Sequence, residues 1–194
     1  MEKDIPKPVG SAEVKYSGNI IEVVHQKMQV GDRIKIFEQA RRSPGVRVML
    51  VDGDKMLVTK EYRTEIQDWD FRIPGGKVFD SLEEYRAAVE SGKDMLASAS
   101  DAAKKEVLEE TGLVVDEIRH FTTSGTGGPT VRWDMYYFVA DKFHLSDGGQ
   151  MLEPGENITF EWMSLDDVRR LCLDGSFKED RTVANILKLL IKNY

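Results

Sequence analysis

Three glutamates, Glu106, Glu109 and Glu110, lie close together just before Gly112. If this stretch is helical, spacings of three and four residues place the three carboxylates on one side of the helix, within reach of a common point. Near the carboxyl end of a helix each negative charge costs roughly 0.3–1 kcal/mol. A bound Mg²⁺ ion, which prefers oxygen ligands and substrate phosphates, would offset the repulsion. The cluster therefore indicates a Mg²⁺ site that can hold a pyrophosphate; the alternative is a solvated charged face.

The surrounding sequence predicts the helix that would carry this cluster. It runs from about Asp94 or Ser98 to Thr111, and Gly112 is the residue type that commonly follows a helix end. A shorter helix precedes it, because SLEE at 81–84 forms a capping box. Two further helices are predicted near the carboxyl end, over 164–175 and 180–193.

Runs of β-branched and aromatic residues between turn signals predict strands. They cover 18–30, 32–40, 45–63 as a hairpin with a DG turn, 69–76, 114–124, 130–141 and 157–163. The order of strands, helix, strands and helices predicts an α+β fold with layers around one central sheet. Residues 1–40 are expected to form a separate strand arm, and 41–194 the main domain.

Composition excludes several classes of protein. The chain of 194 residues has a net charge of -7, so it lacks the basic surface of a general nucleic-acid or membrane binder. Its single cysteine, Cys172, excludes an internal disulfide and a cysteine-rich zinc site. The start, MEKDIPKPVG, has no apolar leader, and no apolar run approaches the ~20 residues of a membrane span. We therefore predict a cytoplasmic protein with no membrane contact.

The stretch AAKKEVLEETGL, preceded by RIPGG, resembles the signature of the Nudix hydrolases, Gly-x5-Glu-x7-Arg-Glu-U-x-Glu-Glu-x-Gly-U with U apolar. The right half matches at Glu106, Val107, Glu109, Glu110, Gly112 and Leu113. The resemblance implies an α/β/α sandwich in which a mixed sheet lies between helices, with 41–194 as the catalytic domain. It also implies hydrolysis of a nucleoside diphosphate linked to another moiety, with Mg²⁺ or substitute Mn²⁺ as cofactor. Glu106 and Glu110 would be the main metal ligands and catalytic residues, supported by Glu109 and the Gly76 carbonyl.

The sequence departs from this signature in two places. Lys105 replaces the arginine, which keeps the charge but loses the bidentate guanidinium. If Gly76 is the motif glycine, its interval to Lys105 is about fifteen residues too long, and strict register places Ala97 where the first glutamate belongs. We interpret 79–96 as an insertion that contains an extra short helix. Glu83 or Glu84 is a candidate replacement for the missing glutamate, and a solvated helix surface is the alternative.

Two features resemble the branch that hydrolyses ADP-ribose and nucleotide sugars. The run KEYR at 60–63 followed by WDFRIPGG at 69–76 is similar to a run in that branch, although Arg72 replaces an acidic residue there. Pro129 falls at about the place where that branch has a proline after the signature.

Several side chains are candidates for substrate contacts. Arg41, Arg42 and Arg63 can bind phosphate or ribose because a guanidinium matches phosphate geometry; surface ion pairing is the alternative. Trp69 and Trp133 can stack on a base or pack in the core. Our expected substrate-binding residues are Arg63, Arg42 and Pro129.

Relatives in this branch use a glutamate in a loop beyond the signature as the general base. The loop SDGGQMLEPGEN, 146–157, offers Glu153 and Glu156, and Glu156 fits better because it lies two residues before the strand that starts at Ile158. Such a carboxylate must lie within hydrogen-bond reach of the attacking water. Solvated loop acids are the alternative.

The sequence therefore predicts a Mg²⁺-dependent pyrophosphohydrolase that cleaves ADP-ribose or a nucleotide sugar to a nucleoside monophosphate and a sugar phosphate. The alternatives are hydrolysis of a dinucleotide or capped RNA end, and a Nudix-fold sensor that binds a nucleotide sugar without cleaving it. The acidic net charge argues against RNA. By analogy with the ADP-ribose branch, the amino-terminal strands predict a homodimer.

Overall fold

The computed structural model describes residues 5–193 and contains two compact units. The first unit comprises the chain up to Pro44 together with Phe79–Met95 and Gly125–Asp134. The second comprises Gly45–Val78, Leu96–Ser124 and the chain from Met135 onward. The first four residues of the expected arm lie outside the described part, and the division into 1–40 and 41–194 stays a prediction.

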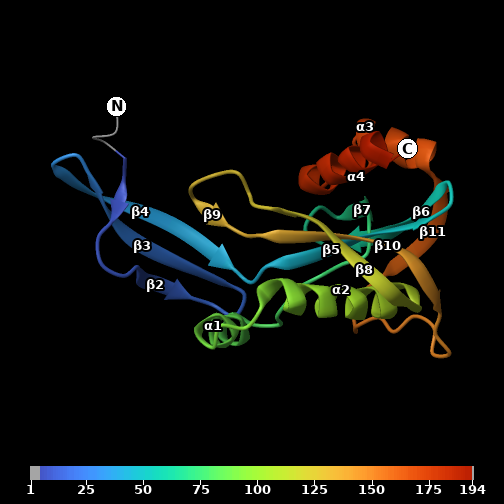
Figure 1. The fold of residues 1–194 in the computed structure, drawn as a ribbon, viewed down its shortest axis with the longest axis horizontal. Helices are drawn as coiled ribbons and strands as arrows, with labels where there is room; N and C mark the ends of the chain where they lie inside the picture. The colour runs from blue at the N-terminus through green and yellow to red at the C-terminus, as the bar shows by residue number, and fades with distance from the viewer. Residues whose placement is uncertain (1–4, 194) are drawn as a thin grey trace. The chain divides into compact units, whose positions relative to one another are not determined.

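The first unit is built on a five-stranded sheet (blue in Figure 1, with β9 in orange-yellow). Its strands are β1 (Lys7–Pro8), β2 (Glu13–Ser17), β3 (Ile21–Val30), β4 (Arg33–Arg42) and β9 (Val131–Arg132). The hairpin of β3 and β4 is paired over its full length, and Gly31, at φ +58°, allows the tight turn. This confirms the predicted strands at 18–30 and 32–40.

The first unit also contains the extra helix predicted within 79–96, α1 (Leu82–Glu90). The Ser81 side chain accepts a hydrogen bond from the Glu84 N–H at 3.2 Å, as the capping box predicts. The Glu84 carboxylate in turn accepts from the Asp80 N–H at 3.2 Å. Glu83 and Glu84 are both exposed, so in this structure they lie on a solvated helix surface.

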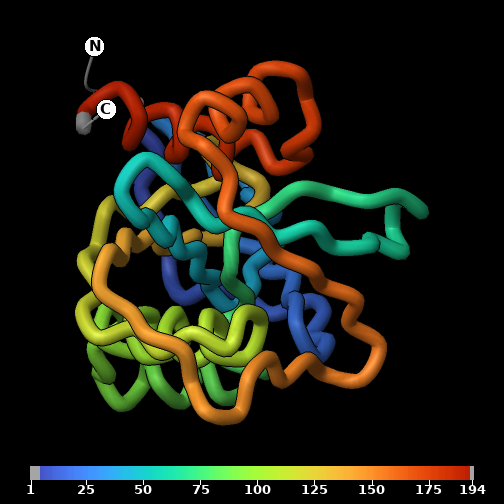
Figure 2. The backbone as a smooth tube through the Cα atoms, turned by 90° about the vertical axis from the view of Figure 1, so that its right-hand side faces the viewer, coloured from blue at the N-terminus to red at the C-terminus, as the bar shows by residue number. Residues whose placement is uncertain are grey.

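A mixed six-stranded sheet forms the centre of the second unit, in the order β11-β6-β5-β10-β8 with β7 paired to β6. Its strands are β5 (Gly45–Asp52), β6 (Lys55–Arg63), β7 (Asp68–Arg72), β8 (Leu113–Ser124), β10 (Met135–Leu145) and β11 (Ile158–Ser164). β5 and β10 are parallel, and the other pairs are antiparallel. Figure 2 shows the β6–β7 hairpin extending away from the rest of this unit.

The single strand predicted at 130–141 is wrong. The chain forms two strands there, because Val131–Arg132 pairs with β4 whereas Met135–Leu145 pairs with β5 and β8. Each segment thus completes a different sheet, which the local β-propensity of the sequence does not reveal.

Helices cover both faces of the second sheet: α2 (Met95–Thr111) lies on one face, and α3 (Leu165–Leu173) and α4 (Asp180–Asn193) lie on the other (Figure 1). Ser164 caps α3 by accepting from the Asp167 N–H at 3.1 Å. This arrangement confirms the predicted α+β fold of the α/β/α sandwich type. Among residues 5–193, none of the helices combines the length and apolarity needed to span a membrane.

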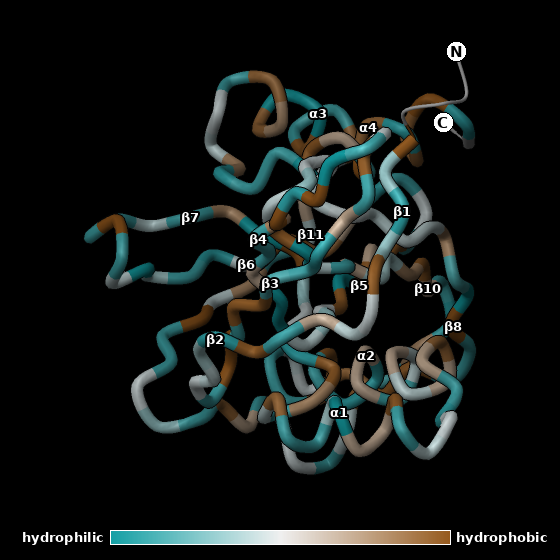
Figure 3. The backbone as a smooth tube through the Cα atoms, turned by 90° about the vertical axis from the view of Figure 1, so that its left-hand side faces the viewer, coloured by the Kyte–Doolittle hydropathy of each residue, from teal (hydrophilic) through white to brown (hydrophobic). Residues whose placement is uncertain are grey.

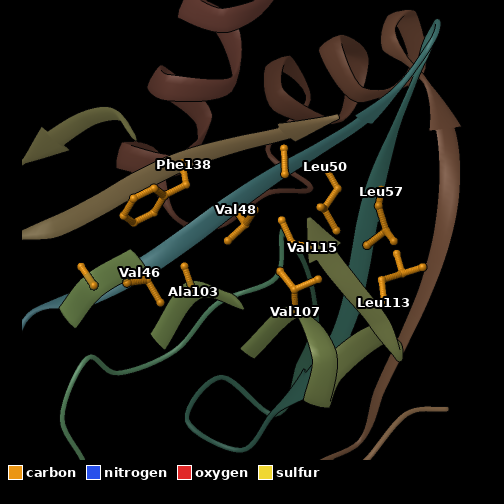
Figure 4. Packing of buried hydrophobic residues seen from close by; sticks show 11 residues of the cluster. Val46, Val48, Leu50, Leu57, Ala103, Val107, Leu113, Val115 and Phe138 are labelled. Carbon is orange, nitrogen blue, oxygen red and sulfur yellow. The ribbon is translucent and has the colours of Figure 1, made fainter. Parts of the chain in front are cut away.

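The core of the second unit lies between α2 and the sheet. β5 and β10 carry hydrophobic segments (Figure 3), and alternate residues of β5 point toward α2, where they meet helix residues spaced four apart (Figure 4). The cluster comprises Val46, Val48, Leu50, Leu57, Ala99, Ala103, Val107, Leu113, Val115, Phe138 and Ala140. Its contacts fix the rotation of α2 about its own axis and therefore the direction in which the neighbouring glutamates point.

Candidate functional site

The final turns of α2 carry the three glutamates found in the sequence. The helix ends where Gly112, at φ +71°, adopts the left-handed conformation and donates its N–H to the Leu108 carbonyl at 2.8 Å. Because Val107 is buried in the core, Glu106 and Glu110 on either side of it lie partly or largely out of solvent; Glu110 is 9% exposed.

A Pro-Gly-Gly turn approaches these carboxylates from the sheet. The Pro74 carbonyl accepts from the Val48 N–H at 2.8 Å, which ties the turn to β5. Gly75 has φ +148°, and a side chain there would lie 2.1 Å from the Val46 carbonyl oxygen, so glycine is required. The Gly75 N–H donates to Oε2 of Glu110 at 3.3 Å, which joins the turn to α2.

Gly76 lies directly against Glu106. A Cβ at Gly76 would be 2.1 Å from Oε1 of Glu106, so this carboxylate occupies the space that the glycine leaves open. The Gly76 carbonyl accepts from the Val46 N–H at 2.9 Å and keeps a second lone pair. Glu109 pairs with Lys105 at 3.4 Å. The structure thus brings together Glu106, Glu110 and Gly76. The resemblance to the Nudix signature had suggested Gly76 as the motif glycine despite its long interval to the glutamates.

Burial makes ionisation of the two inner glutamates unfavourable. It raises the pKa of Glu110 to about 8; Arg47 acts in the opposite direction, and the charge of Glu106 adds to the increase. Burial likewise raises the pKa of Glu106 to about 7, with a further increase from the neighbouring Glu109. Two carboxyl groups with raised pKa values on one helix face are a recurrent property of functional sites.

Sequence reasoning missed a buried arginine next to this site. Arg47 on β5 donates to the Gly75 carbonyl and forms an ion pair with Glu179 at 3.1 Å. Its charge lowers the pKa of both Glu110 and Glu106. The available signal was a single charged residue within the otherwise apolar strand GVRVMLV. Glu179, just before α4, gave no comparable signal.

The loop between β10 and β11 runs across the carboxyl end of α2 (orange in Figure 2). The Met151 N–H donates to the Glu109 carbonyl at 2.8 Å, and Nε2 of Gln150 donates to the Glu110 carbonyl at 2.6 Å. The Ser146 N–H donates to the Gly112 carbonyl at 2.9 Å. These bonds satisfy carbonyls that a helix end leaves unpaired and hold the loop beside the glutamates.

This loop contains both candidates for the general base. The charge of Glu156 raises the pKa of Glu106, so Glu156 lies within electrostatic range of the cluster. Oε2 of Glu156 accepts from the Glu153 N–H at 2.9 Å, which orders the turn between them. The role of Glu156 as the preferred candidate stays a prediction.

The β6–β7 hairpin carries Arg63, one of the expected substrate-binding residues. Arg63 forms ion pairs with Glu61 and Glu65, both at 2.7 Å. Arg72 pairs with Asp70 at 2.8 Å and lies 3.6 Å from Glu61, whose charge raises the pKa of Glu110. The arginines of this hairpin are thus engaged with acids in the present structure.

The two candidate tryptophans differ in environment. Trp69, on β7, is 38% exposed, and its ring packs edge to face on Tyr62 with the ring centres 5.7 Å apart. The alternative that Trp69 packs in the core is therefore wrong. Trp133 lies in the first unit, where the guanidinium of Arg42 stacks on its ring at 4.2 Å.

Arg42 and Trp133 line a cavity of about 590 Å³ within the first unit. Its other polar and aromatic lining residues include Glu22, Arg41, Tyr85, Arg86, Glu90, Arg132 and Asp134. Within the described chain, the buried Nε of Arg41 has no hydrogen-bond partner. Pro129 is near the cavity in sequence, but its carbonyl accepts from Nε2 of Gln39 at 3.4 Å and it is not part of the lining.

The donor set at the end of α2 fits a hard divalent cation. Carboxylate and carbonyl oxygens are the preferred ligands of such a cation, and its positive charge would offset the burial and mutual repulsion that raise the pKa values of Glu106 and Glu110. Within residues 5–193, no group of three or more His, Cys, Asp or Glu side chains is already arranged to hold a metal ion. The fit therefore rests on the nature and charge of the donors, and binding would draw the carboxylates together.

Comparison with known proteins identifies the family and agrees with the fold. The family model described as the NUDIX domain matches residues 41–186. A solved structure described as "Crystal structure of ADP compounds hydrolase" superposes with a TM-score of 0.69, covering 94% of this chain and 90% of that chain at 16% identity. At this identity the likeness concerns the fold. No curated protein matches the sequence.

Proposed function

The chain belongs to the Nudix family of hydrolases acting on phosphoric anhydrides, and from this premise we propose that it hydrolyses ADP-ribose or a nucleotide sugar in a Mg²⁺-dependent reaction. Membership of this family implies a pyrophosphohydrolase whose substrate is linked to a nucleoside diphosphate. The products of the proposed reaction are a nucleoside monophosphate and a sugar phosphate. Mn²⁺ is the expected substitute for Mg²⁺.

One observation carries this proposal. On α2, the half-buried Glu106 and the buried Glu110 lie against the Gly75–Gly76 turn, with pKa values raised to about 7 and about 8. A solvated charged helix face would expose its carboxylates to water and leave their pKa values near the ordinary range. The observed environment instead favours a role in which the two carboxylates bind a cation, whose positive charge offsets the cost of ionising them.

We assign metal binding to Glu106 and Glu110, with Glu109 and the Gly76 carbonyl as supporting ligands. A divalent cation held there supplies Lewis-acid polarisation of phosphoryl oxygens. The Gly75–Gly76 turn accommodates the Glu106 carboxylate, which fills the space that a side chain at Gly76 would take, and Lys105 beside Glu109 provides positive charge for a pyrophosphate on the outer side of the helix.

Glu156 is our candidate for the general base that accepts a proton from the attacking water. Two observations support this role: the charge of Glu156 raises the pKa of Glu106, and the bonds of Gln150 and Met151 to the end of α2 hold its loop in place. Glu156→Gln is expected to lower kcat by about 10²–10⁴-fold with little change in melting temperature. Glu153→Gln, in the same loop, is the matched control and is expected to stay near wild type. Steady-state kinetics of both variants decides; a larger loss for Glu153→Gln would transfer the role to that residue.

The substrate class rests on three predicted contacts and one structural likeness. Arg42 lines an arginine-rich cavity and Arg63 lies on the β6–β7 hairpin, where guanidinium groups can bind phosphate or ribose. We also propose that Pro129, in the loop before β9, contributes to substrate binding. The description of the superposed structure as an ADP compounds hydrolase supports a substrate that contains adenosine diphosphate.

Incubation of the protein with ADP-ribose, nucleotide sugars, dinucleotides and capped RNA in the presence of Mg²⁺ tests the proposal, with products identified by mass spectrometry. We expect the fastest turnover for ADP-ribose or a nucleotide sugar. Faster cleavage of a dinucleotide or capped RNA would change the substrate class. The Nudix-fold sensor is favoured by Lys105 and by exposed Ala97 at the place of a signature glutamate; it predicts that a ligand raises the melting temperature while no product forms with Mg²⁺ or Mn²⁺.

We further propose a homodimer formed through the first sheet. Ile34 and Ile36 are two residues apart on β4, so they point to the same face, and they are 52% and 60% exposed. Apolar residues gathered on one exposed sheet face are typical of an interaction surface, and a second copy offers a matching apolar face. Light scattering is expected to give twice the chain mass of 22.0 kDa, whereas a monomer would remove this proposal.

A further inference from the structure

The buried arginine of β5 interrupts an otherwise apolar strand. Val46 and Val48, its neighbours on the strand, point into the core beneath α2, so Arg47 points to the opposite face of the sheet, the face covered by α4. Its side chain is 9% exposed. A charged side chain in such a place needs partners, because burying an unpaired charge is strongly unfavourable.

Arg47 joins the site turn to the start of α4. It donates one hydrogen bond to the Gly75 carbonyl and another, from Nε at 3.1 Å, to Oε2 of Glu179. Thr182 donates to the same Glu179 oxygen at 2.9 Å, and the hydroxyl of Tyr137 lies 3.1 Å from that of Thr182. Burial opposes the ionisation of Glu179, but the charge of Arg47 and these hydrogen bonds outweigh it, so the pKa of Glu179 is lowered. The pair is therefore charged and fully hydrogen-bonded.

Gly75 is the residue through which this network reaches the glutamates. Its carbonyl accepts from Arg47, while its N–H donates to Glu110 at 3.3 Å. Both polar groups of Gly75 are thus fixed, one from each side. Because a guanidinium presents several donors in a rigid fork, arginine can hold Gly75 and Glu179 at once, which a lysine ammonium does with less fixed geometry.

We propose that Arg47 is a positioning residue for the acidic site: it fixes the Gly75 turn, and through it the Glu110 carboxylate. This inference rests on the proposed function and adds a residue to it. Arg47 does not touch the substrate or the reacting atoms in this assignment. A buried ion pair that served stability alone could be replaced by apolar residues with little loss.

The test separates a positioning role of Arg47 from a contribution to stability alone, because a double variant removes both members of the ion pair together. Arg47→Met alone removes the closer charged partner of the half-buried Glu179 and leaves it the longer ion pair with Arg181 at 3.8 Å, so we expect a drop in melting temperature. The double variant R47M/E179Q has no buried charge at this place, and its melting temperature is expected to return toward wild type. Arg119→Met is the control. It removes an exposed ion pair between Arg119 on β8 and Asp141 on β10, and we expect its melting temperature, kcat and cation affinity to match those of the wild type.

Two readouts are measured on the double variant: steady-state kinetics, and calorimetric titration with Mg²⁺ or Mn²⁺ in the absence of substrate. Loss of a residue that orients metal ligands typically weakens metal affinity or activity by about 10–100-fold, and we expect losses of this size in kcat and in cation affinity, with KM changed less than kcat. Arg47→Lys retains a donor for the Gly75 carbonyl and is expected to recover part of kcat relative to the double variant.

A stably folded double variant with wild-type kcat and cation affinity would overturn the proposal. An Arg47→Lys kcat no higher than that of the double variant would overturn the role of the hydrogen bond to the Gly75 carbonyl. Failure of the proposed function is distinguishable, because wild-type protein would then turn over no diphosphate substrate, while the cation titration would still compare Arg47 variants with wild type.

Discussion

Replacing Glu110 by Gln is expected to lower kcat/KM for the diphosphate substrate by about 10³-fold, because cation catalysis supplies several kcal/mol of transition-state stabilisation and about 1.4 kcal/mol corresponds to tenfold in rate. Glutamine keeps the shape and can still accept a hydrogen bond from the Gly75 N–H, but it carries no charge for a cation. The fold is expected to remain intact. Since the replacement removes a buried ionisable group, the metal-free variant should be at least as stable as wild type at pH 8.

Glu117→Gln provides the matched control. Glu117 is also a glutamate of the second unit, but it is 64% exposed and pairs with Lys142 at 2.8 Å, so its replacement is expected to leave kinetics and stability nearly unchanged. Steady-state kinetics and thermal unfolding of both variants give the comparison. Activity of Glu110→Gln near wild type in a folded protein would remove Glu110 from the site.

Without divalent cations, the stability of the protein is expected to fall as pH rises from about 5 to about 8.5. The pKa values of Glu106 and Glu110 in the folded state, about 7 and about 8, are above the ordinary value of 4.5. Between these values the folded state binds more protons than the unfolded state, so stability is fully present below about pH 4.5 and is lost as pH rises through the folded pKa values. At about 1.4 kcal/mol per pKa unit, the change from Glu110 is on the order of 4 kcal/mol.

The charged groups around the two carboxyls determine how large this effect is. Arg47 and Lys105 favour ionisation of Glu106, whereas Glu109 and Glu156 oppose it. A bound divalent cation adds positive charge and opposes the trend: at a concentration of 100 Kd it stabilises the folded state by about 2.7 kcal/mol. Because cations bind the ionised carboxylates, Mg²⁺ should raise the melting temperature more at pH 8.5 than at pH 5.5.

Thermal unfolding across this pH range, in EDTA and in Mg²⁺, measures both effects. Glu110→Gln is expected to flatten the decline seen in EDTA and to reduce the Mg²⁺ shift. Stability that is independent of pH between 5 and 8.5 in wild type, or an equal Mg²⁺ shift at both pH values, would contradict the assigned environment of the carboxyls.

The elements that carry the site were predictable because their signals are local. Gly112 marks the end of α2, and Ser81 with Glu84 marks the start of α1. The four-residue spacing of Glu106 and Glu110 predicts their shared helix face. Resemblance to the Nudix signature then identified Gly76 despite the long insertion, and the structure shows the reason for a glycine, since Glu106 fills the space beside it.

The remaining features depend on contacts between distant parts of the chain. Arg47 and Glu179 are 132 residues apart, so neither carries information about the other in the sequence. The change of sheet between β9 and β10 follows from which strand each pairs with, and a propensity pattern does not contain that choice. The cavity of the first unit, which Arg42 and Trp133 line, is likewise formed by three separate segments of the chain that meet only in the fold.

The products formed from ADP-ribose by the wild-type protein test the central claim most directly. In Mg²⁺ we expect AMP and ribose 5-phosphate in equal amounts, and in EDTA we expect neither. Absence of product in Mg²⁺ and Mn²⁺ across all diphosphate substrates, or product formation that EDTA does not reduce, would contradict a cation-dependent hydrolysis at Glu106 and Glu110.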